Sequence, residues 1–193
     1  SLWRSVGAFV AFSLVASAVY VWNDLHDLAA DRQHASKRNR PIAAGRIPIP
    51  KIIGVGAIFA AASVMVAIVI GPVFLLCLLV YVVLNVLYSS VLKRVAMADV
   101  VMLALLYVIR ILAGCAAIGT SPSFWLIAFS LFFFFSLALM KRYAELMNHK
   151  RRARGRGYSP EDAAVVLAIG AGAGVASVLI AGLYLNAPET AVM

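Results

Sequence analysis

Six long apolar stretches fill most of this chain of 193 residues and constrain its fold more than any other feature. Each is close to the run of about 20 mostly apolar residues that a helix needs to cross a membrane. Apolar residues make up 64% of the sequence, against about 45–50% in soluble domains, which argues against a soluble enzyme. We therefore predict an all-α, polytopic bundle with transmembrane helices over residues 5–22, 52–70, 73–92, 98–119, 123–140 and 163–185.

The basic residues predict how these helices are oriented. Fifteen of the 17 Lys and Arg residues fall in the connections 23–51, 93–97 and 141–162. Because Lys and Arg concentrate in cytoplasmic loops, we expect these three connections in the cytoplasm and both chain ends outside. The same distribution accounts for most of the net charge of +9, so we expect the lipid bilayer, and no nucleic acid, as a partner.

The remaining breaks are short. Gly71-Pro72 and residues 120–123 turn the chain back at the membrane face and form helical hairpins. Nothing in the sequence indicates a separable soluble domain. We expect residues 1–193 to form a single transmembrane domain. Because the chain lacks an initiator Met and opens close to a span, we also expect a fragment of a longer protein.

Carboxylates cluster where the first apolar stretch ends. Asp24, Asp27 and Asp31 stand at i, i+3 and i+7, which lie on one stripe if the first helix continues past the membrane face. Like charges at that spacing repel, and a bound cation would relieve the repulsion. Mg²⁺ suits the pattern because it takes oxygen ligands and bridges to substrate phosphates. The alternative is a solvated helix end, which the adjoining Asn23 disfavours.

Basic residues follow this acidic stripe. Lys37, Arg38 and Arg40 precede Pro41, in a segment that Pro41 and Gly45 predict to be a loop. Cationic side chains beside an acidic metal stripe suit a phosphorylated ligand. An anchor against lipid headgroups is the alternative.

The third span carries a polar edge. Tyr81, Asn85, Ser89 and Lys93 follow one another at i+4 steps, with Tyr88 beside them. An amide within the membrane needs a partner inside the bundle, so this edge is either a cavity wall or a contact between helices.

Charged residues also lie in the fourth and fifth spans. Asp99 and Arg110 are three helical turns apart on one face, and an intramembrane Arg is a candidate functional residue. Its alternative role is a structural pair with a carboxylate. Lys141 and Glu145, at the end of the fifth span, stand at i, i+4 and could pair with each other.

These motifs together resemble the UbiA superfamily of intramembrane prenyltransferases. Asn23-Asp24-x-x-Asp27-x-x-x-Asp31, followed by Lys37-Arg38-x-Arg40-Pro41, is similar to its first signature, and Tyr88-Ser89-x-x-Leu92-Lys93 to its Tyr-[Ser/Thr]-x-x-Leu-Lys segment. The resemblance implies a bundle of about nine helices around one cavity, of which this chain holds about six.

The resemblance also implies roles for these residues. Asp24, Asp27 and Asp31 would be catalytic residues that hold Mg²⁺ and, with Asn23, the leaving diphosphate. The substrate-binding residues would be Lys37, Arg38, Arg40, Tyr88, Lys93, Arg110 and Lys141. Lys141, Tyr143 and Glu145 would form the opposing wall of the site, with a general-base role left open for this segment.

One departure from the family pattern points to a branch. A second acidic motif, Asp-x-x-x-Asp, is usual where this sequence has Lys141-Arg142-Tyr143-Ala144-Glu145, so Lys141 and Arg142 could instead meet a phosphate directly. With Arg110, this segment is similar to the polyprenyl-phosphate (decaprenyl-phosphate) phosphoribosyltransferase branch. That branch moves a 5-phosphoribosyl group from phosphoribosyl diphosphate to a polyprenyl phosphate for cell-wall synthesis.

We therefore expect a Mg²⁺-dependent transferase of the bacterial inner membrane that acts on a polyprenyl phosphate or diphosphate, with its site loops in the cytoplasm. One alternative is prenyl transfer from a polyprenyl diphosphate to an aromatic or other lipid acceptor, as in a 4-hydroxybenzoate polyprenyltransferase. A membrane transporter is the alternative from another class, although the polar residues concentrate at one membrane face rather than at mid-membrane.

Overall fold

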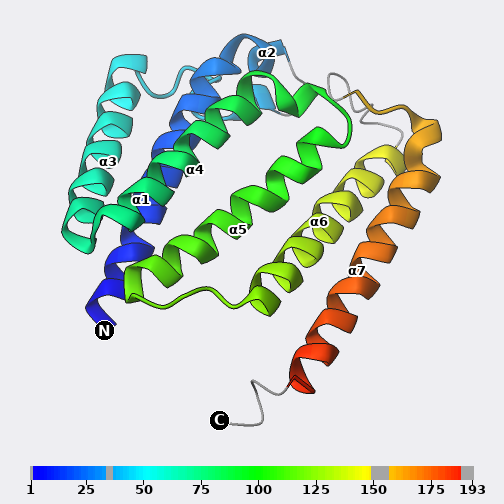
Figure 1. Cartoon of the computed structure of the whole chain (residues 1–193). Helices are drawn as coiled ribbons and strands as arrows, with labels where there is room; N and C mark the ends of the chain where they lie inside the picture. Colours follow the sequence, from blue (N-terminus) through cyan, green and yellow to red (C-terminus); the bar gives the residue numbers. More distant parts are fainter. Residues whose placement is uncertain (1, 34–36, 149–156, 188–193) are drawn as a thin grey trace. The chain divides into compact units, whose positions relative to one another are not determined.

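The structure is a computed structural model that describes residues 2–33, 37–148 and 157–187 (Figure 1). Within these residues all regular structure is helical. Six helices are long and apolar enough to cross a membrane, as predicted: α1 (Leu2–His26), α3 (Ile49–Ile70), α4 (Pro72–Ser90), α5 (Ala98–Ile118), α6 (Phe124–Met147) and α7 (Ala163–Leu185). Four short ones lie in the connections: α2 (Leu28–Gln33), η1 (Lys37–Asn39), η2 (Leu92–Arg94) and η3 (Pro160–Asp162).

The first helix continues past the apolar stretch that predicted it. After α1 ends, the Asp27 N–H donates to the Asn23 carbonyl at 2.9 Å, and the Asp31 N–H donates to the Asp27 carbonyl at 2.8 Å. These i+4 hydrogen bonds carry helical geometry through a turn at Asp27 into α2. The first helix therefore continues past the membrane face over most of the segment from Asp24 to Asp31, as a shared carboxylate stripe requires.

The fifth predicted span also extends further than its apolar run. We predicted its end at residue 140, whereas α6 ends at Met147, about two turns later. The difference arises because hydropathy marks where a helix leaves the membrane and not where its hydrogen bonding stops. Lys141, Tyr143 and Glu145 consequently lie on the last turns of a helix.

The chain divides into two compact units, residues 1–82 with 116–119, and residues 83–115 with 120–193. In the first unit α1 packs along α3, where the buried Ser63 hydroxyl donates to the Ala11 carbonyl at 2.8 Å. The Phe12 ring of α1 meets the rings of Phe74 and Tyr81 edge-on, at 5.7 and 5.3 Å between centroids. Aromatic edges and small residues therefore bring the helices of this unit together.

In the second unit α6 packs along α7. The Ser136 hydroxyl of α6 donates to the Gly170 carbonyl of α7 at 2.7 Å. A Cβ atom at Gly170 would lie 2.8 Å from Cε of Met140 and 3.1 Å from Cβ of Leu139, so a larger residue there would require side chains of α6 to shift. At the start of α7, Ser159 and Asp162 form a capping box around Pro160, as their order in the sequence predicts.

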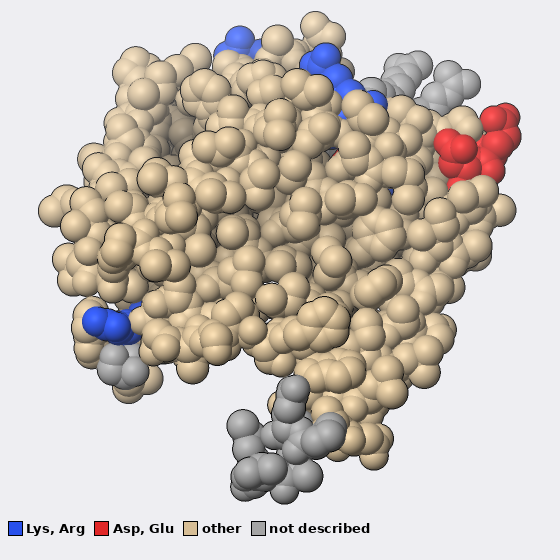
Figure 2. All heavy atoms as spheres, viewed as in Figure 1, with Lys and Arg blue, Asp and Glu red and all other residues tan. Residues whose placement is uncertain are grey.

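Charge is distributed along the helices as a membrane requires. On the face shown in Figure 2, charged side chains gather at helix ends, whereas the flanks between them are uncharged. Uncharged flanks of six apolar helices identify an integral membrane protein.

Candidate functional site

The first unit brings acidic and basic side chains together beyond the end of α1. Nη1 of Arg40 lies 2.9 Å from Oδ1 of Asp24 and 2.8 Å from Oδ2 of Asp31. Nζ of Lys37 lies 3.5 Å from Oδ1 of Asp31. Four side chains selected by the sequence motif thus form one cluster, which we call the acid–base cluster.

The turn after η1 positions Arg40. The Ala44 N–H donates to the Arg40 carbonyl at 2.8 Å, and Gly45 has a φ of +70°, the left-handed backbone that glycine adopts without strain. The turn keeps this segment compact, and Arg32 of α2 binds it through the Ala43 carbonyl at 3.4 Å.

The cluster has a buried end and an exposed end. The Asp31 side chain is 4% exposed, whereas those of Asp24 and Arg40 are 36% and 44% exposed. A buried carboxylate requires charged or hydrogen-bonding partners, and Asp31 has both Arg40 and Lys37. Asp31 is therefore fixed in place, while the Asp24 end remains open to a ligand.

The carboxylate oxygens of Asp24 and Asp31 converge on one point, because both contact the same guanidinium nitrogen. Within the described residues, no three His, Cys, Asp or Glu side chains are grouped to hold a metal ion. Mg²⁺ commonly takes one or two protein carboxylates and completes its octahedron with waters and substrate phosphates. Asp24 and Asp31 supply two such carboxylates. In the structure the Arg40 guanidinium occupies the point between them, so Mg²⁺ would bind both only if Arg40 turned towards the substrate phosphates.

The other residues of the first motif are placed separately. The Asp27 carboxylate lies 3.3 Å from Nδ1 of the neighbouring His26. Asn23 is half-buried and supplies its carbonyl to the helix, and Arg38 is exposed in η1. The structure therefore groups Asp24, Asp31, Lys37 and Arg40 and leaves the roles of these three residues as predictions.

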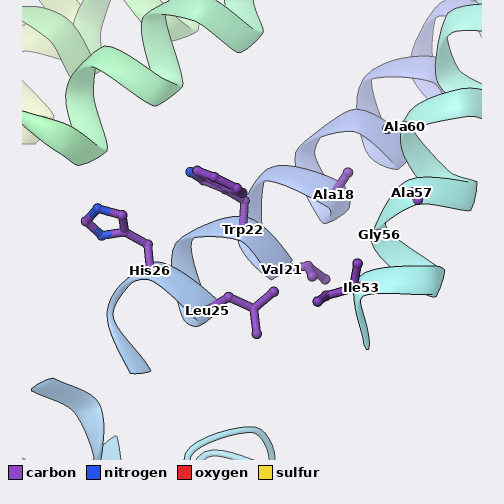
Figure 3. A pocket seen from close by; sticks show the side chains of 9 residues that line it. All are labelled: Ala18, Val21, Trp22, Leu25, His26, Ile53, Gly56, Ala57 and Ala60. Atoms are coloured by element: carbon purple, nitrogen blue, oxygen red, sulfur yellow. The ribbon is translucent and has the colours of Figure 1, made fainter. Parts of the chain in front are cut away.

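A groove of about 520 Å³ runs between α1 and α3 in the same unit (Figure 3). Its lining is almost entirely apolar and comes from Ala18, Val21, Trp22, Leu25 and His26 of α1 with Ile53, Gly56, Ala57 and Ala60 of α3. Successive residues of a helix are about 100° apart, which puts the α1 residues of this groove on the side opposite Asp24 and Asp31. The groove is therefore separate from the acid–base cluster.

The polar edge of α4 is largely buried. Tyr81, Asn85 and Ser89 are buried, and Tyr88 and Lys93 are half-buried. Burial at i+4 steps confirms that this edge faces the protein interior, while the ligand-binding roles of Tyr88 and Lys93 stay predictions.

The second unit contains a network that the sequence did not reveal. Nε of Arg142 donates to Oδ2 of Asp99 at 2.6 Å, and Nη1 of Arg142 donates to Oε2 of Glu145. The side chains of Arg142 and Asp99 are 1% and 0% exposed. The expectation that Arg142 meets a phosphate directly is therefore wrong, because its guanidinium is buried and occupied by two carboxylates.

Tyr158 completes this network. Its hydroxyl donates to Oδ1 of Asp99 at 2.6 Å and accepts the Met97 N–H at 2.8 Å. Burial, together with the hydrogen bond to Asp99, raises the pKa of the Tyr158 phenol above its ordinary value. We call Asp99, Arg142, Glu145 and Tyr158 the Asp99 network. The only sequence signal for Tyr158 was its position just before the cap of α7.

The other predicted residues of this unit lie at accessible positions. Lys141 is exposed on α6, Tyr143 is half-buried, and the Glu145 side chain is 32% exposed. Glu145 pairs with Arg142, one turn back on α6. The exposed Arg110 guanidinium lies 5.3 Å from the centroid of the Tyr107 ring, a cation–π contact.

Comparison with known proteins agrees with these motifs. The profile of the UbiA prenyltransferase family matches residues 1–185. The chain belongs to this family. A UbiA homolog from Archaeoglobus fulgidus, solved with GPP and Mg²⁺, superimposes on the whole chain and on 70% of its own length with a TM-score of 0.82 at 21% sequence identity. That similarity confirms the helical fold.

Two curated relatives match most of the chain. An uncharacterized protein of Sinorhizobium fredii, y4nM, is 42% identical over 94% of the chain. Decaprenyl-phosphate phosphoribosyltransferase of Mycobacterium tuberculosis is 38% identical over 72% of the chain. The chain spans 36% and 46% of the lengths of these two relatives.

Proposed function

We propose that this chain carries the cation and phosphate site of a Mg²⁺-dependent membrane transferase that moves a 5-phosphoribosyl group from phosphoribosyl diphosphate to a polyprenyl phosphate. The observation that carries the proposal is the convergence of Asp24 and Asp31 on Arg40, with Lys37 beside them. Similarity to the mycobacterial phosphoribosyltransferase supports the choice of transferred group.

In this proposal the acid–base cluster binds the diphosphate of the donor. Asp24 and Asp31 hold Mg²⁺, with Asp27 and Asn23 as further candidates in the same motif. When bound, Mg²⁺ neutralises charge on the departing diphosphate and so lowers the barrier to its release. Arg40, as a guanidinium fork, and Lys37, as a point charge, donate hydrogen bonds to phosphate oxygens.

The transfer is a substitution at C1 of the ribose. An oxygen of the polyprenyl phosphate forms a bond to C1 while the bond from C1 to the diphosphate breaks, and the diphosphate leaves with the electron pair. We assign phosphate contacts to Arg38, Lys93 and Lys141, and further substrate contacts to Tyr88, Arg110 and Tyr143. Glu145 belongs to the wall formed by Lys141 and Tyr143.

Prenyl transfer is the second candidate, because the family takes its name from it. In that reaction a polyprenyl diphosphate is the donor and an aromatic ring or another lipid is the acceptor. The acid–base cluster would serve either donor, since both present a diphosphate. The segment around Lys141 favours phosphoribosyl transfer, in which both substrates bring phosphate groups.

We propose that the protein works in the bacterial inner membrane with the acid–base cluster in the cytoplasm, where phosphorylated sugars are made. The direct test supplies membranes containing the full chain and Mg²⁺ with one of two substrate pairs. The first pair is labelled phosphoribosyl diphosphate with polyprenyl phosphate, and the second is polyprenyl diphosphate with labelled 4-hydroxybenzoate. A labelled lipid from the first pair alone is the expected result, and a labelled lipid from the second pair alone would overturn the proposal.

A further inference from the structure

The Asp99 network connects two segments to which we have assigned substrate contacts. One arm runs from Asp99 through Arg142 to Glu145 on the last turns of α6. The other runs from Asp99 through Tyr158 to the main chain at Met97, four residues after Lys93. Both arms meet on the two oxygens of a single carboxylate that is 0% exposed.

We propose that Asp99, Arg142 and Tyr158 are positioning residues that fix Glu145 and the turn carrying Lys93 in the geometry that the transfer reaction requires. This inference rests on the proposed function, because only there does Glu145 belong to the wall of the site and Lys93 contact a phosphate. It names residues that touch no substrate and act through their neighbours.

The burial of Arg142 excludes it from direct contact with a ligand. Its planar guanidinium uses Nε on Asp99 and Nη1 on Glu145, which fixes the orientation of the whole fork. Glu145 has a side chain that is 32% exposed, so Arg142 holds it from the buried side while the carboxylate remains accessible. The network therefore limits the rotamers of Glu145 without covering it.

Tyr158 fixes the second segment by equally close contacts. Besides the Met97 N–H bond, the backbone at Gly157 packs so tightly that a Cβ there would lie 2.7 Å from the Arg94 carbonyl. Met97 itself has a φ of +64°, an uncommon conformation for a residue with a side chain. The chain between Lys93 and Asp99 is thus held in one shape by contacts with the segment before α7.

Stability alone does not account for such a network. Replacing a buried ion pair by apolar residues of similar volume is often neutral or stabilising, because desolvating two charges offsets their attraction. Removing one partner, by contrast, leaves a buried charge unpaired and is strongly destabilising. An apolar replacement can preserve stability, but it cannot hold Glu145 and Lys93 in a fixed orientation. The test therefore compares stability with activity after such a replacement.

The test compares three variants of the full chain in membranes. Asp99→Leu combined with Arg142→Met removes both buried charges, and Tyr158→Phe removes one hydroxyl and keeps the ion pair. Tyr20→Phe, at an exposed position on α1, is the matched control for loss of a hydroxyl. For each we measure the thermal midpoint in detergent and kcat and KM with phosphoribosyl diphosphate and polyprenyl phosphate, normalised to folded protein.

We expect the double variant to fold with a thermal midpoint close to that of the wild type and to lose about tenfold to a hundredfold in kcat/KM, the scale of a misplaced catalytic group. Tyr158→Phe should lose less, and Tyr20→Phe nothing. In a Glu145→Gln background, Asp99→Leu with Arg142→Met should lower kcat/KM by clearly less than it does in the wild type, because the carboxylate that the network positions is already replaced.

Two outcomes would overturn the positioning role. A double variant that folds and retains full kcat/KM shows that the network is only structural. A Tyr158→Phe protein that loses stability but keeps kcat/KM per folded molecule shows that the arm through Tyr158 is also only structural. Failure of the proposed function is distinguishable, since the wild type would then produce no labelled lipid from phosphoribosyl diphosphate.

Discussion

The Tyr158 hydroxyl donates a 2.6 Å hydrogen bond to Asp99, a residue 59 positions earlier in the chain. The bond joins the segment before α7 to the first turn of α5. It also places a phenol next to a carboxylate that Arg142 already holds, so the proton on the phenol is required for the network to remain intact. The pH dependence of stability is therefore informative.

We predict that Tyr158 contributes to stability up to about pH 10 and that its contribution declines above that pH. An unfolded tyrosine ionises near pH 10, whereas the raised pKa keeps the folded phenol protonated. The folded state then binds a proton that the unfolded state has lost, so stability falls as the pH rises towards the folded pKa. Thermal midpoints of wild type and Tyr158→Phe in detergent, from pH 8 to 11, should converge as the pH rises above 10.

The control for this experiment is Tyr20→Phe, at an exposed position on α1, whose midpoint should run parallel to that of the wild type over the same range. A constant difference between wild type and Tyr158→Phe at all these pH values would contradict the role assigned to the phenolic proton.

Gly157 should tolerate no side chain. Its φ of +72° disfavours any L-residue, and an added Cβ would lie 2.7 Å from the Arg94 carbonyl and 3.0 Å from the Ala96 nitrogen. Because both atoms belong to the backbone, they cannot move aside cheaply, and we expect Gly157→Ala to cost about 1–3 kcal/mol of stability. Gly182→Ala is the matched control: nothing lies within 4 Å of its Cβ position inside α7, so it should be neutral or slightly stabilising. Equal thermal midpoints for the two variants would show that the close approach is not rigid.

The metal site predicts loss of activity when the metal or either of its carboxylates is removed. We expect EDTA to abolish lipid labelling and Mg²⁺ or Mn²⁺ to restore it. Asp24→Asn and Asp31→Asn should each lose at least about 10²-fold in rate, roughly 2.7 kcal/mol of transition-state stabilisation. Asp27→Asn should lose a similar amount if its place in the motif reflects metal binding.

Glu161→Gln serves as control, because this exposed carboxylate at the start of α7 lies outside both the acid–base cluster and the Asp99 network. Full activity in Asp31→Asn with EDTA present would reject the metal site. Loss of activity only in Asp27→Asn would move the site away from Arg40.

The orientation in the membrane can be tested by labelling. With Cys77 and Cys115 replaced by Ala, single cysteines at Arg46 and Ser159 should react with a membrane-impermeant maleimide only from the cytoplasmic side. A cysteine at Ser121 should react only from the outside. The prediction follows from the concentration of Lys and Arg in alternate connections. Labelling of Arg46 and Ser159 positions from outside would reverse the topology.

Features that depend on local sequence could be predicted. Apolar length alone located the six spans, because a membrane imposes that length on any helix that crosses it. Helical periodicity placed Asp24 and Asp31 on one stripe, and Pro41 with Gly45 indicated the turn that carries Arg40. The acid–base cluster is built from residues close together in the chain, within reach of such rules.

The Asp99 network could not be predicted from local sequence, because its contacts join residues that are far apart in the chain. Periodicity put Asp99 and Arg110 on one face of α5 but could not show that Arg142, 43 residues later, is the partner of Asp99. A basic pair at a helix end likewise does not reveal which side chain turns inward. In the structure Lys141 is exposed and Arg142 is buried, a distinction set by the packing of α6 against its neighbours.

This distinction changes what is expected of the segment that replaces the second acidic motif. Only Lys141 is accessible to a phosphate, since Arg142 is occupied by Asp99 and Glu145. We therefore predict that Lys141→Ala raises KM for a phosphorylated substrate several-fold and affects kcat less, because loss of uniform binding has that signature. Steady-state kinetics with phosphoribosyl diphosphate and polyprenyl phosphate varied in turn will identify which phosphate Lys141 binds.

The reverse substitution gives a sharper result. Restoring the family pattern with Lys141→Asp and Glu145→Asp would set two carboxylates against phosphate and shorten the side chain that Arg142 holds. We expect this double variant to lose transfer of the phosphoribosyl group completely, while Lys141→Gln, which removes the charge alone, retains part of it. Should the double variant remain active with phosphoribosyl diphosphate, Lys141 would have no role in phosphate binding. Should it instead gain prenyl transfer to 4-hydroxybenzoate, the residues of this segment would be what separates the two reactions within the family.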